Sequence, residues 1–166
     1  MADLVRRTTL VVRDAEAAAD WYGHVFGLRR WMDTPFTLSG RQLAAGAAGD
    51  ATRLVIMAGA DDRLGMIGLL QWLEGQGPPP PPVPPTRIAF GAPIFVVEAE
   101  DCTATVARAR ARGSRIHAEP ERWEVTGADG VRMAMLGASL WDRDGYFFEV
   151  NERLGPAAPA TDRPVA

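Results

Sequence analysis

The feature that most constrains the fold is an internal repeat. The run LVVRD at residues 10–14 precedes an alanine-rich segment that ends at Gly27. The run FVVEA at residues 95–99 precedes a second alanine-rich segment, which ends at Gly113. The offset is 85 residues between the runs and 86 residues between the glycines. Self-similarity at a fixed spacing indicates copies of one structural unit, so we expect two related units in this chain of 166 residues.

Each copy is predicted to contain a strand, a helix and then three strands. In the first copy, the apolar and β-branched run 4–12 predicts a strand, and apolar residues at helical spacing predict a helix over 15–26. Asp14 suits the N-cap and Gly27 suits the C-terminal end of this helix. Its predicted solvent face consists of Glu16, Asp20 and His24. The other strands are expected at 28–34, 52–58 and 64–72, and in the second copy at 88–97, 115–119, 131–141 and 145–151. The second helix is expected at 101–112.

The segments outside these elements suggest the domain organisation. We expect a first module at 1–74, a linker at 75–87, a second module at 88–154 and a disordered tail at 155–166. Residues 35–51 are rich in small residues and are interpreted as a loop at a cavity rim. The proline run within the linker favours polyproline II, which makes it either a stiff spacer or a docking peptide.

Composition excludes several kinds of chemistry. All 18 basic residues are arginine, so a Schiff-base lysine and a P-loop lysine are absent. A net charge of −3 argues against nucleic acid as a partner, because phosphate binding needs clustered cations. No apolar run is long enough to span a membrane. The single Cys102 and the absence of a secretory signal predict a cytoplasmic protein.

Two motifs resemble the glyoxalase/bleomycin-resistance/dioxygenase family, also called the vicinal oxygen chelate family. The first is LVVRD at 10–14 with WYGHVFGL at 21–28, and the second is WDRDGYFFEV at 141–150. The resemblance covers about residues 4–152. It implies an α+β fold in which tandem βαβββ modules form a cup-shaped half-barrel, and a homodimer. It leaves the activity open, because one fold supports many functions.

The same resemblance implies where a metal would bind. Metal-using members take ligands from the first and last strands of each module, and these positions correspond here to Arg7, Leu69, Ala92 and Glu149. Gln71 is the nearest alternative to Leu69. Of the four corresponding residues, Glu149 alone offers a donor that a transition metal uses. We therefore expect no metal at these positions and no other cofactor.

The pair Arg7 and Glu149 suggests three alternatives. The two side chains form an ion pair that fills the cup, or Arg7 binds a ligand oxygen while Glu149 acts as acceptor or general base. In the third alternative, a register slip turns Arg7 outward. Tyr146 is a further candidate, because its hydroxyl can donate to a bound oxygen.

Aromatic residues form the second group of candidates. Five tryptophans are many for a chain of this length, and they either pack in the core or stack on a flat apolar ligand. The candidate ligand-binding residues are Trp31, Met57, Gln71, Trp72, His117, Trp123 and Trp141.

Two classes of function remain. One is a metal-free protein that binds a small aromatic or amphipathic molecule in its cup. The other is a glyoxalase-like lyase or isomerase, either metal-free with Glu149 as general base or metal-dependent through ligands that these motifs do not reveal.

Overall fold

The computed structural model describes residues 3–73, 77 and 85–157. By internal contacts the chain divides into a first unit, Met1–Arg87 with Arg143–Gly145, and a second unit, Ile88–Asp142 with Tyr146–Ala166. Most of the predicted polyproline linker, and the predicted tail beyond residue 157, lie outside the described residues.

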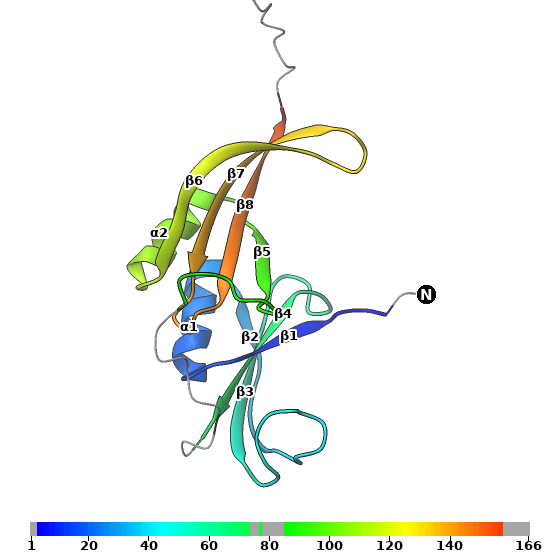
Figure 1. Cartoon of the computed structure of the whole chain (residues 1–166), viewed down its shortest axis with the longest axis vertical. Coiled ribbons are helices and arrows are strands. Elements are labelled where there is room, and N and C mark those ends of the chain that lie inside the picture. Colours follow the sequence, from blue (N-terminus) through cyan, green and yellow to red (C-terminus); the bar gives the residue numbers. More distant parts are fainter. Residues whose placement is uncertain (1–2, 74–76, 78–84, 158–166) are drawn as a thin grey trace, which may run out of the picture. The chain divides into compact units, whose positions relative to one another are not determined.

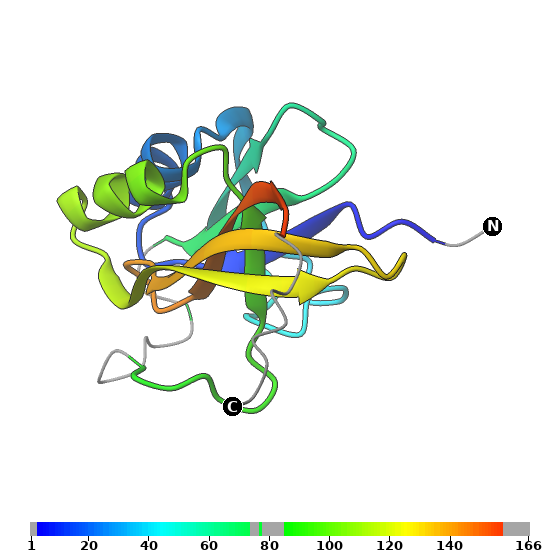
Figure 2. The same cartoon turned by 90° about the horizontal axis from the view of Figure 1, so that it is seen from above.

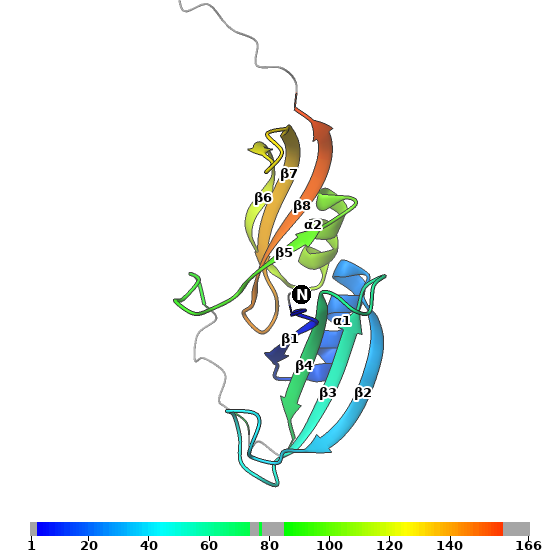
Figure 3. The same ribbon diagram turned by 90° about the vertical axis from the view of Figure 1, so that its right-hand side faces the viewer.

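The first unit is a four-stranded mixed sheet with one helix. Its elements are β1 (Arg7–Val11), α1 (Ala15–Phe26), β2 (Arg29–Thr37), β3 (Ala51–Ala58) and β4 (Met66–Trp72). The strand order is β1-β4-β3-β2, with β1 parallel to β4 and the other pairs antiparallel. Figure 3 shows β2, β3 and β4 side by side, with α1 along one face of them.

The second unit repeats this arrangement. Its elements are β5 (Ile94–Glu98), α2 (Cys102–Ala111), β6 (Arg115–Thr126), β7 (Arg132–Trp141) and β8 (Phe147–Pro156). The order β5-β8-β7-β6 matches the first sheet strand for strand, again with one parallel pair. The strands are labelled in Figure 1, and Figure 2 shows α2 (green) on one side of the β6–β7 hairpin (yellow). The predicted α+β fold of tandem βαβββ modules is confirmed, and neither sheet closes on itself, which is consistent with a half-barrel.

Both helices begin at an aspartate. Asp14 accepts hydrogen bonds from the backbone N–H groups of Glu16 and Ala17, and Asp101 accepts one from Ala104. Such caps satisfy N–H groups that have no partner within the helix. Helix α1 ends at Gly27, whose φ of 70° lies in the left-handed region that favours glycine. The predicted cap and end of α1 are therefore confirmed.

In each unit the helix covers one face of the sheet, and we call this the helix face. Residues on the helix face are the most deeply buried ones, because apolar side chains of the helix and of alternate strand positions pack there. In the first unit these include Leu10, Val55 and Leu69, and in the second they include Leu140, Phe148 and Val150. Residues one position away along each strand point to the opposite face of the sheet.

Several strands differ in length from the predicted ones. β6 continues to Thr126, because it pairs with β7 as far as Thr126 opposite Arg132. Glu121, which lies beyond the strand expected at 115–119, is therefore part of a strand. β8 reaches Pro156, two residues into the predicted tail, because Gly155 and Pro156 pair with β7. β6 is an edge strand, and most of its side chains are exposed on both faces. It consequently lacks the apolar alternation by which strands are predicted.

An ion-pair network joins α1 to its sheet. Arg30 in β2 pairs with Glu16, and with Asp20 at 3.2 Å, while Arg53 in β3 pairs with Glu16 at 2.7 Å and with Asp33 at 2.6 Å. Hydrogen bonds from the two arginines lower the pKa of Glu16 from its ordinary value of 4.5 to about 2. The predicted solvent face of α1 is thus partly an interface with β2 and β3.

Candidate functional site

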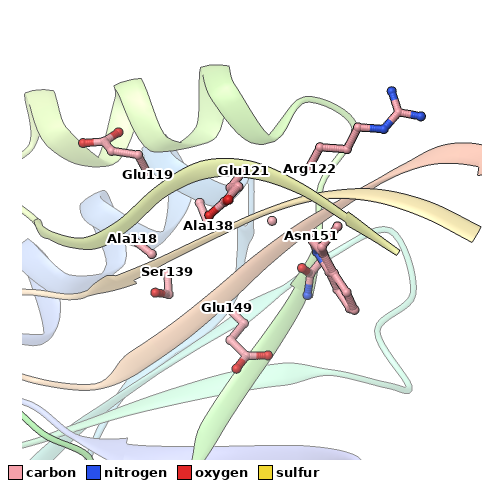
Figure 4. Close-up of a pocket in the computed structure, with 10 residues that line it drawn as sticks. Ala118, Glu119, Glu121, Arg122, Ala138, Ser139, Glu149 and Asn151 are labelled. Atoms are coloured by element: carbon pink, nitrogen blue, oxygen red, sulfur yellow. The ribbon is translucent and has the colours of Figure 1, made fainter. Parts of the chain in front are cut away.

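The candidate site is a pocket of about 510 Å³ in the second unit, formed by β6, β7 and β8. We call it the second-unit pocket. It is lined by Ala118, Glu119, Glu121, Arg122, Trp123, Gly137, Ala138, Ser139, Glu149 and Asn151. Figure 4 shows these residues and the strands that hold them. Two of the sequence candidates, Trp123 and Glu149, lie in it together.

The strand register explains how the pocket is shaped. Residues that pair across antiparallel strands point to the same face. One row across the sheet contains Glu121, Gly137 and Asn151, and the neighbouring row contains Ala118, Ser139 and Glu149. The central strand β7 therefore contributes small residues, while the strands on both sides contribute longer polar ones. With about 4.8 Å between neighbouring strands, β6 and β8 lie about 10 Å apart and form the two walls.

Trp123 lies over the glycine of the central strand. A Cβ atom added to Gly137 would come within 2.6 Å of the indole Nε1 of Trp123 and 2.9 Å of Oδ1 of Asn151. Such distances are too short for carbon contacts, so the absence of a side chain at Gly137 lets the indole lie there. Trp123 still exposes 42% of its surface. A flat aromatic surface is thus held beside the pocket and remains open to a ligand.

The charge of the pocket is predominantly negative. Glu119 is neutralised by Arg110 of α2 at 2.5 Å, and in Figure 4 it extends toward that helix. Arg122 extends away from Ser139 and Glu149 in the same view. Within the described part of the chain, Glu121 and Glu149 form no ion pair. Two carboxylates therefore face the pocket from opposite walls without a counter-ion.

Sequence reasoning missed Glu121, Ser139 and Asn151 as site residues. A usable signal was present: Gly137 with Ser139, and Glu149 with Asn151, are small or polar residues two positions apart that alternate with apolar residues. Residues with that spacing share one face of a strand. What the sequence does not show is that the two strands are neighbours in a register that places the pairs side by side.

The other proposed catalytic residues lie elsewhere. Arg7 belongs to the first unit, on the face opposite α1, where its Cδ passes 3.2 Å from the point that a Cβ on Gly68 would occupy. Glu149 belongs to the second unit, so the pair of Arg7 with Glu149 stays a prediction. Tyr146 is half-buried at the start of β8, and its ring meets Phe95 edge-on at 6.4 Å.

Two ligand-binding candidates are on the helix face of the first unit. Gln71 accepts a hydrogen bond from the backbone N–H of Ala15 at 3.0 Å, at the start of α1. Met57 is 1% exposed, and its Cε lies 4.0 Å from the point that a Cβ on Gly23 of the helix would occupy. Both side chains therefore support the packing of α1, on the face opposite Arg7.

The remaining candidates are dispersed. Trp31 donates from its Nε1 to Asp62 and lies beside Arg6, at 5.7 Å. Trp72 is buried under the loop of residues 38–50 and donates to Asp50 at 3.1 Å. In the second unit, Trp141 and His117 both contact the ring of Phe147, at 4.9 and 5.7 Å. Of the seven candidate ligand-binding residues, Trp141 and His117 therefore lie close to each other at Phe147. A third candidate, Trp123, lies in the second-unit pocket.

Comparison of the strand pairings in the two repeats corrects one of the residues expected at the metal-ligand positions. Leu10 pairs with Leu69 in the first unit, and its repeat counterpart Phe95 pairs with Phe148 in the second. The structural counterpart of Glu149 is therefore Leu70, and the expectation of Leu69 is wrong by one residue. Because side chains alternate along a strand, this slip moves the position to the other face.

The corrected position does not supply a metal donor. Leu70 is an apolar residue packed with Leu38 and Trp72, and Ala92 has no donor in its side chain. Within the described residues there is no group of three or more His, Cys, Asp or Glu side chains arranged to hold a metal ion. The residues at these positions do not fit a transition metal, which needs about three or four N, O or S donors.

Comparison with known proteins identifies the family. The model of the Glyoxalase/Bleomycin resistance protein/Dioxygenase superfamily matches residues 4–150, so this chain belongs to that superfamily. A search of curated proteins found no match. None of the described helices is long and apolar enough to cross a membrane.

Solved structures support the same fold. A glyoxalase family protein from Bacillus cereus is 18% identical with a TM-score of 0.74, over 93% of this chain and 97% of that one. Leishmania major glyoxalase I, described as trypanothione-dependent, is 15% identical with a TM-score of 0.59, over 91% and 87%. A glyoxalase/bleomycin resistance protein/dioxygenase family enzyme from Burkholderia phytofirmans is 15% identical with a TM-score of 0.53, over 92% and 100%. Identities this low establish the fold and leave the activity open.

Proposed function

We propose that this protein binds a small aromatic or amphipathic molecule in the second-unit pocket, without a metal. The observation that carries the proposal is the combination of an exposed indole, Trp123, with small residues on the pocket floor and polar groups on both walls. Small-molecule sites typically combine an apolar or aromatic surface with a few placed polar groups. The volume of about 510 Å³ suits a ligand of one or two rings.

The test uses a matched pair of tryptophans. Trp31 and Trp123 are 41% and 42% exposed, so replacing either one removes a similar aromatic surface. Binding is measured by ligand-observed NMR with a panel of naphthalene alcohols, amines and carboxylates. We expect saturable binding of some members, about tenfold weaker in Trp123→Ala, since an aromatic contact contributes about 1 kcal/mol beyond its area. Trp31→Ala should bind like the wild type. Equal losses in both variants, or no binding of any member, would contradict the proposal.

A second candidate function is a lyase or isomerase reaction with Glu149 as general base. It is favoured by the placement of Glu149, whose carboxylate is exposed, has no ion pair among the described residues and lies in the same row as Ser139. A carboxylate placed like this can take a proton from carbon next to a carbonyl group, which is the first step of many isomerisations.

Proton exchange tests this candidate without knowledge of the product. In deuterated water, a base that removes a carbon-bound proton replaces it with deuterium, so the proton NMR signal of the substrate disappears. We would follow hydroxyacetone and methylglyoxal with wild-type protein, Glu149→Gln and Glu124→Gln, whose carboxylate is paired with Arg132 and does not line the pocket. Enzyme-dependent exchange that Glu149→Gln abolishes and Glu124→Gln retains would support the reaction. Exchange that survives in Glu149→Gln would remove this residue as the base.

A further inference from the structure

The unbalanced charge of the second-unit pocket indicates what kind of ligand it accepts. Glu121 and Glu149 face the pocket from β6 and β8, while Glu119 is already paired with Arg110. Both carboxylates are exposed, so each contributes a modest attraction to a cationic ligand, and a ligand between them meets both. An anionic ligand would meet two like charges, which disfavours it.

Ser139 supplies a second polar group that is open to a ligand. Its side chain lies between the two walls and is 9% exposed, and its hydroxyl has no hydrogen-bond partner among the described residues. The hydroxyl oxygen still reaches the pocket surface, because it is not among the described buried polar atoms that lack a partner. Ser139 sits in the same row as Glu149, so a group that donates to the carboxylate can also donate to this hydroxyl.

The indole of Trp123 determines the shape of the ligand. A cation placed over the face of a tryptophan ring is attracted by the ring's electron distribution, and a flat cation also stacks on it. Asn151, in the row next to that of Glu149, adds an amide oxygen that accepts hydrogen bonds. A bare metal ion would use none of this aromatic surface, and the described residues provide no cluster of three ligands for one.

We propose that the second-unit pocket binds a flat organic cation with N–H donors, such as an amidinium, a guanidinium or a protonated amino-heterocycle. The cationic group lies between Glu121 and Glu149 and donates to Ser139, and the ring stacks on Trp123. This inference rests on the proposed binding function and specifies the class of ligand for the same site.

The experiment compares three probes of the same shape and different charge: benzamidine, benzamide and benzoate. Binding is measured by ligand-observed NMR at low ionic strength. We expect benzamidine to bind saturably and at least tenfold more tightly than benzamide, with no binding of benzoate. Its affinity should fall as salt is added, because exposed charges are screened.

Variants of the two walls locate the interaction. Glu121→Gln and Glu149→Gln should each weaken benzamidine binding by severalfold, and the double variant by tenfold or more. Ser139→Ala should weaken benzamidine binding and leave benzamide unchanged. Glu124→Gln is the matched control, because this carboxylate of β6 is paired with Arg132 and does not line the pocket, and it should bind like the wild type. Circular dichroism verifies that each variant is folded.

Each result decides between the two proposals. If benzamide binds as tightly as benzamidine and both depend on Trp123, small-molecule binding stands and the preference for a cation is overturned. If benzamidine binds equally well to wild type and to the double variant, the site is wrong. If none of the three probes saturates while the neutral naphthalenes do, the cation proposal alone is overturned.

Discussion

Gly137 lies in the middle of β7, where a side chain would normally project into the pocket. The indole of Trp123 and the amide of Asn151 occupy that space instead. The backbone there does not adopt a left-handed conformation, so the glycine serves close approach rather than a turn. The geometry of the pocket thus depends on the absence of a Cβ atom at Gly137.

Gly137→Ala is expected to change the pocket more than the stability. The new methyl group would displace the indole of Trp123 and the amide end of Asn151, both of which are side-chain ends and able to move. We therefore expect the free energy of unfolding to change by less than about 1 kcal/mol, while aromatic ligands bind several times more weakly. Urea unfolding and ligand-observed NMR measure the two effects.

Gly59→Ala is the control for this substitution. Its added Cβ would meet Leu28 at 3.9 Å, an ordinary van der Waals contact, so ligand binding should be unchanged. If Gly137→Ala binds aromatic ligands as tightly as the wild type does, the position of Trp123 over Gly137 is unimportant for the ligand.

Between elements, the ion-pair network of α1 with β2 and β3 makes stability depend on pH. The folded protein holds Glu16 charged down to its pKa of about 2, whereas the unfolded chain takes up this proton near 4.5. Protons therefore favour the unfolded state in this range. The lowered pKa of Asp33, caused by its hydrogen bond with Arg53, acts in the same direction. The contribution is complete above about pH 4.5 and is lost progressively as the pH falls toward 2.

We expect Glu16→Gln to flatten the decline in the free energy of unfolding between pH 5 and pH 3. Urea unfolding at several pH values measures this slope. Glu98→Gln is a suitable control, because Glu98 makes an exposed ion pair with Arg153 at 3.1 Å and no other among the residues that the structure describes, and such pairs contribute little. A slope identical in wild type and Glu16→Gln would contradict the role of the network.

A carboxylate of the loop of residues 38–50 connects this loop to its sheet, in addition to the packing of Leu38 on Leu70 and Trp72. Asp50 accepts hydrogen bonds from the backbone N–H of Ala47 at 2.8 Å and from Nε1 of Trp72 at 3.1 Å. In Asp50→Ala, the indole N–H of the buried Trp72 would lose its partner, which costs about 1–3 kcal/mol. We expect a loss of that size in urea unfolding, with faster amide hydrogen exchange confined to the loop.

Asp61→Ala provides the comparison for the loop. Asp61 accepts a hydrogen bond from the backbone N–H of Arg63 at 2.7 Å, in an exposed turn. Removing it should change stability by less than about 0.5 kcal/mol. Equal losses in the two variants would show that Asp50 has no special role as an anchor.

Among the elements of secondary structure, helices are predicted from the sequence better than edge strands are. The boundaries of α1 follow from Asp14, Gly27 and the helical spacing of apolar residues, because local interactions determine a helix and its caps. The end of β6 and the partners of Glu16 depend on which strands become neighbours, and that information is nonlocal. For the same reason Glu149 and Trp123 are found from the sequence, whereas Glu121 and Ser139 become site residues only when β6, β7 and β8 are aligned.

For the whole molecule, the two repeats share one strand order but differ in what their sheets display. In the second unit the face opposite α2 carries polar residues around a pocket. In the first unit the corresponding face carries Leu70 and Trp72, and Leu38 of the loop of residues 38–50 packs on them. Duplication has therefore given two copies of the scaffold, of which the second bears the candidate site.

We propose a homodimer as the assembled state. Within the described residues, β5 pairs with β8 alone, so its other edge is free, and the side chains of Ile94 and Val96 are exposed on one face of this edge strand. Exposed apolar side chains along a free strand edge favour association with another strand. We expect light scattering to give twice the monomer mass, and Val96→Glu to shift the protein toward monomer.

Val131→Glu is the matched control for the dimer. Val131 is 47% exposed, against 67% for Val96, and lies between β6 and β7. The substitution Val131→Glu should therefore leave the mass measured by light scattering unchanged. A monomeric wild type, or dissociation by both substitutions alike, would contradict an interface at β5.

The correspondence of Leu70 with Glu149 has a consequence for protein engineering. A designer who wished to install a chelating centre by matching the two motifs letter by letter would introduce a carboxylate at residue 69, beneath α1, and would disrupt the hydrophobic core. Placed at residue 70, the same carboxylate would project from the other side of β4, but there it would first have to displace Leu38 and Trp72. Restoring inorganic chemistry to the first repeat thus requires reshaping the covering loop as well as exchanging ligands.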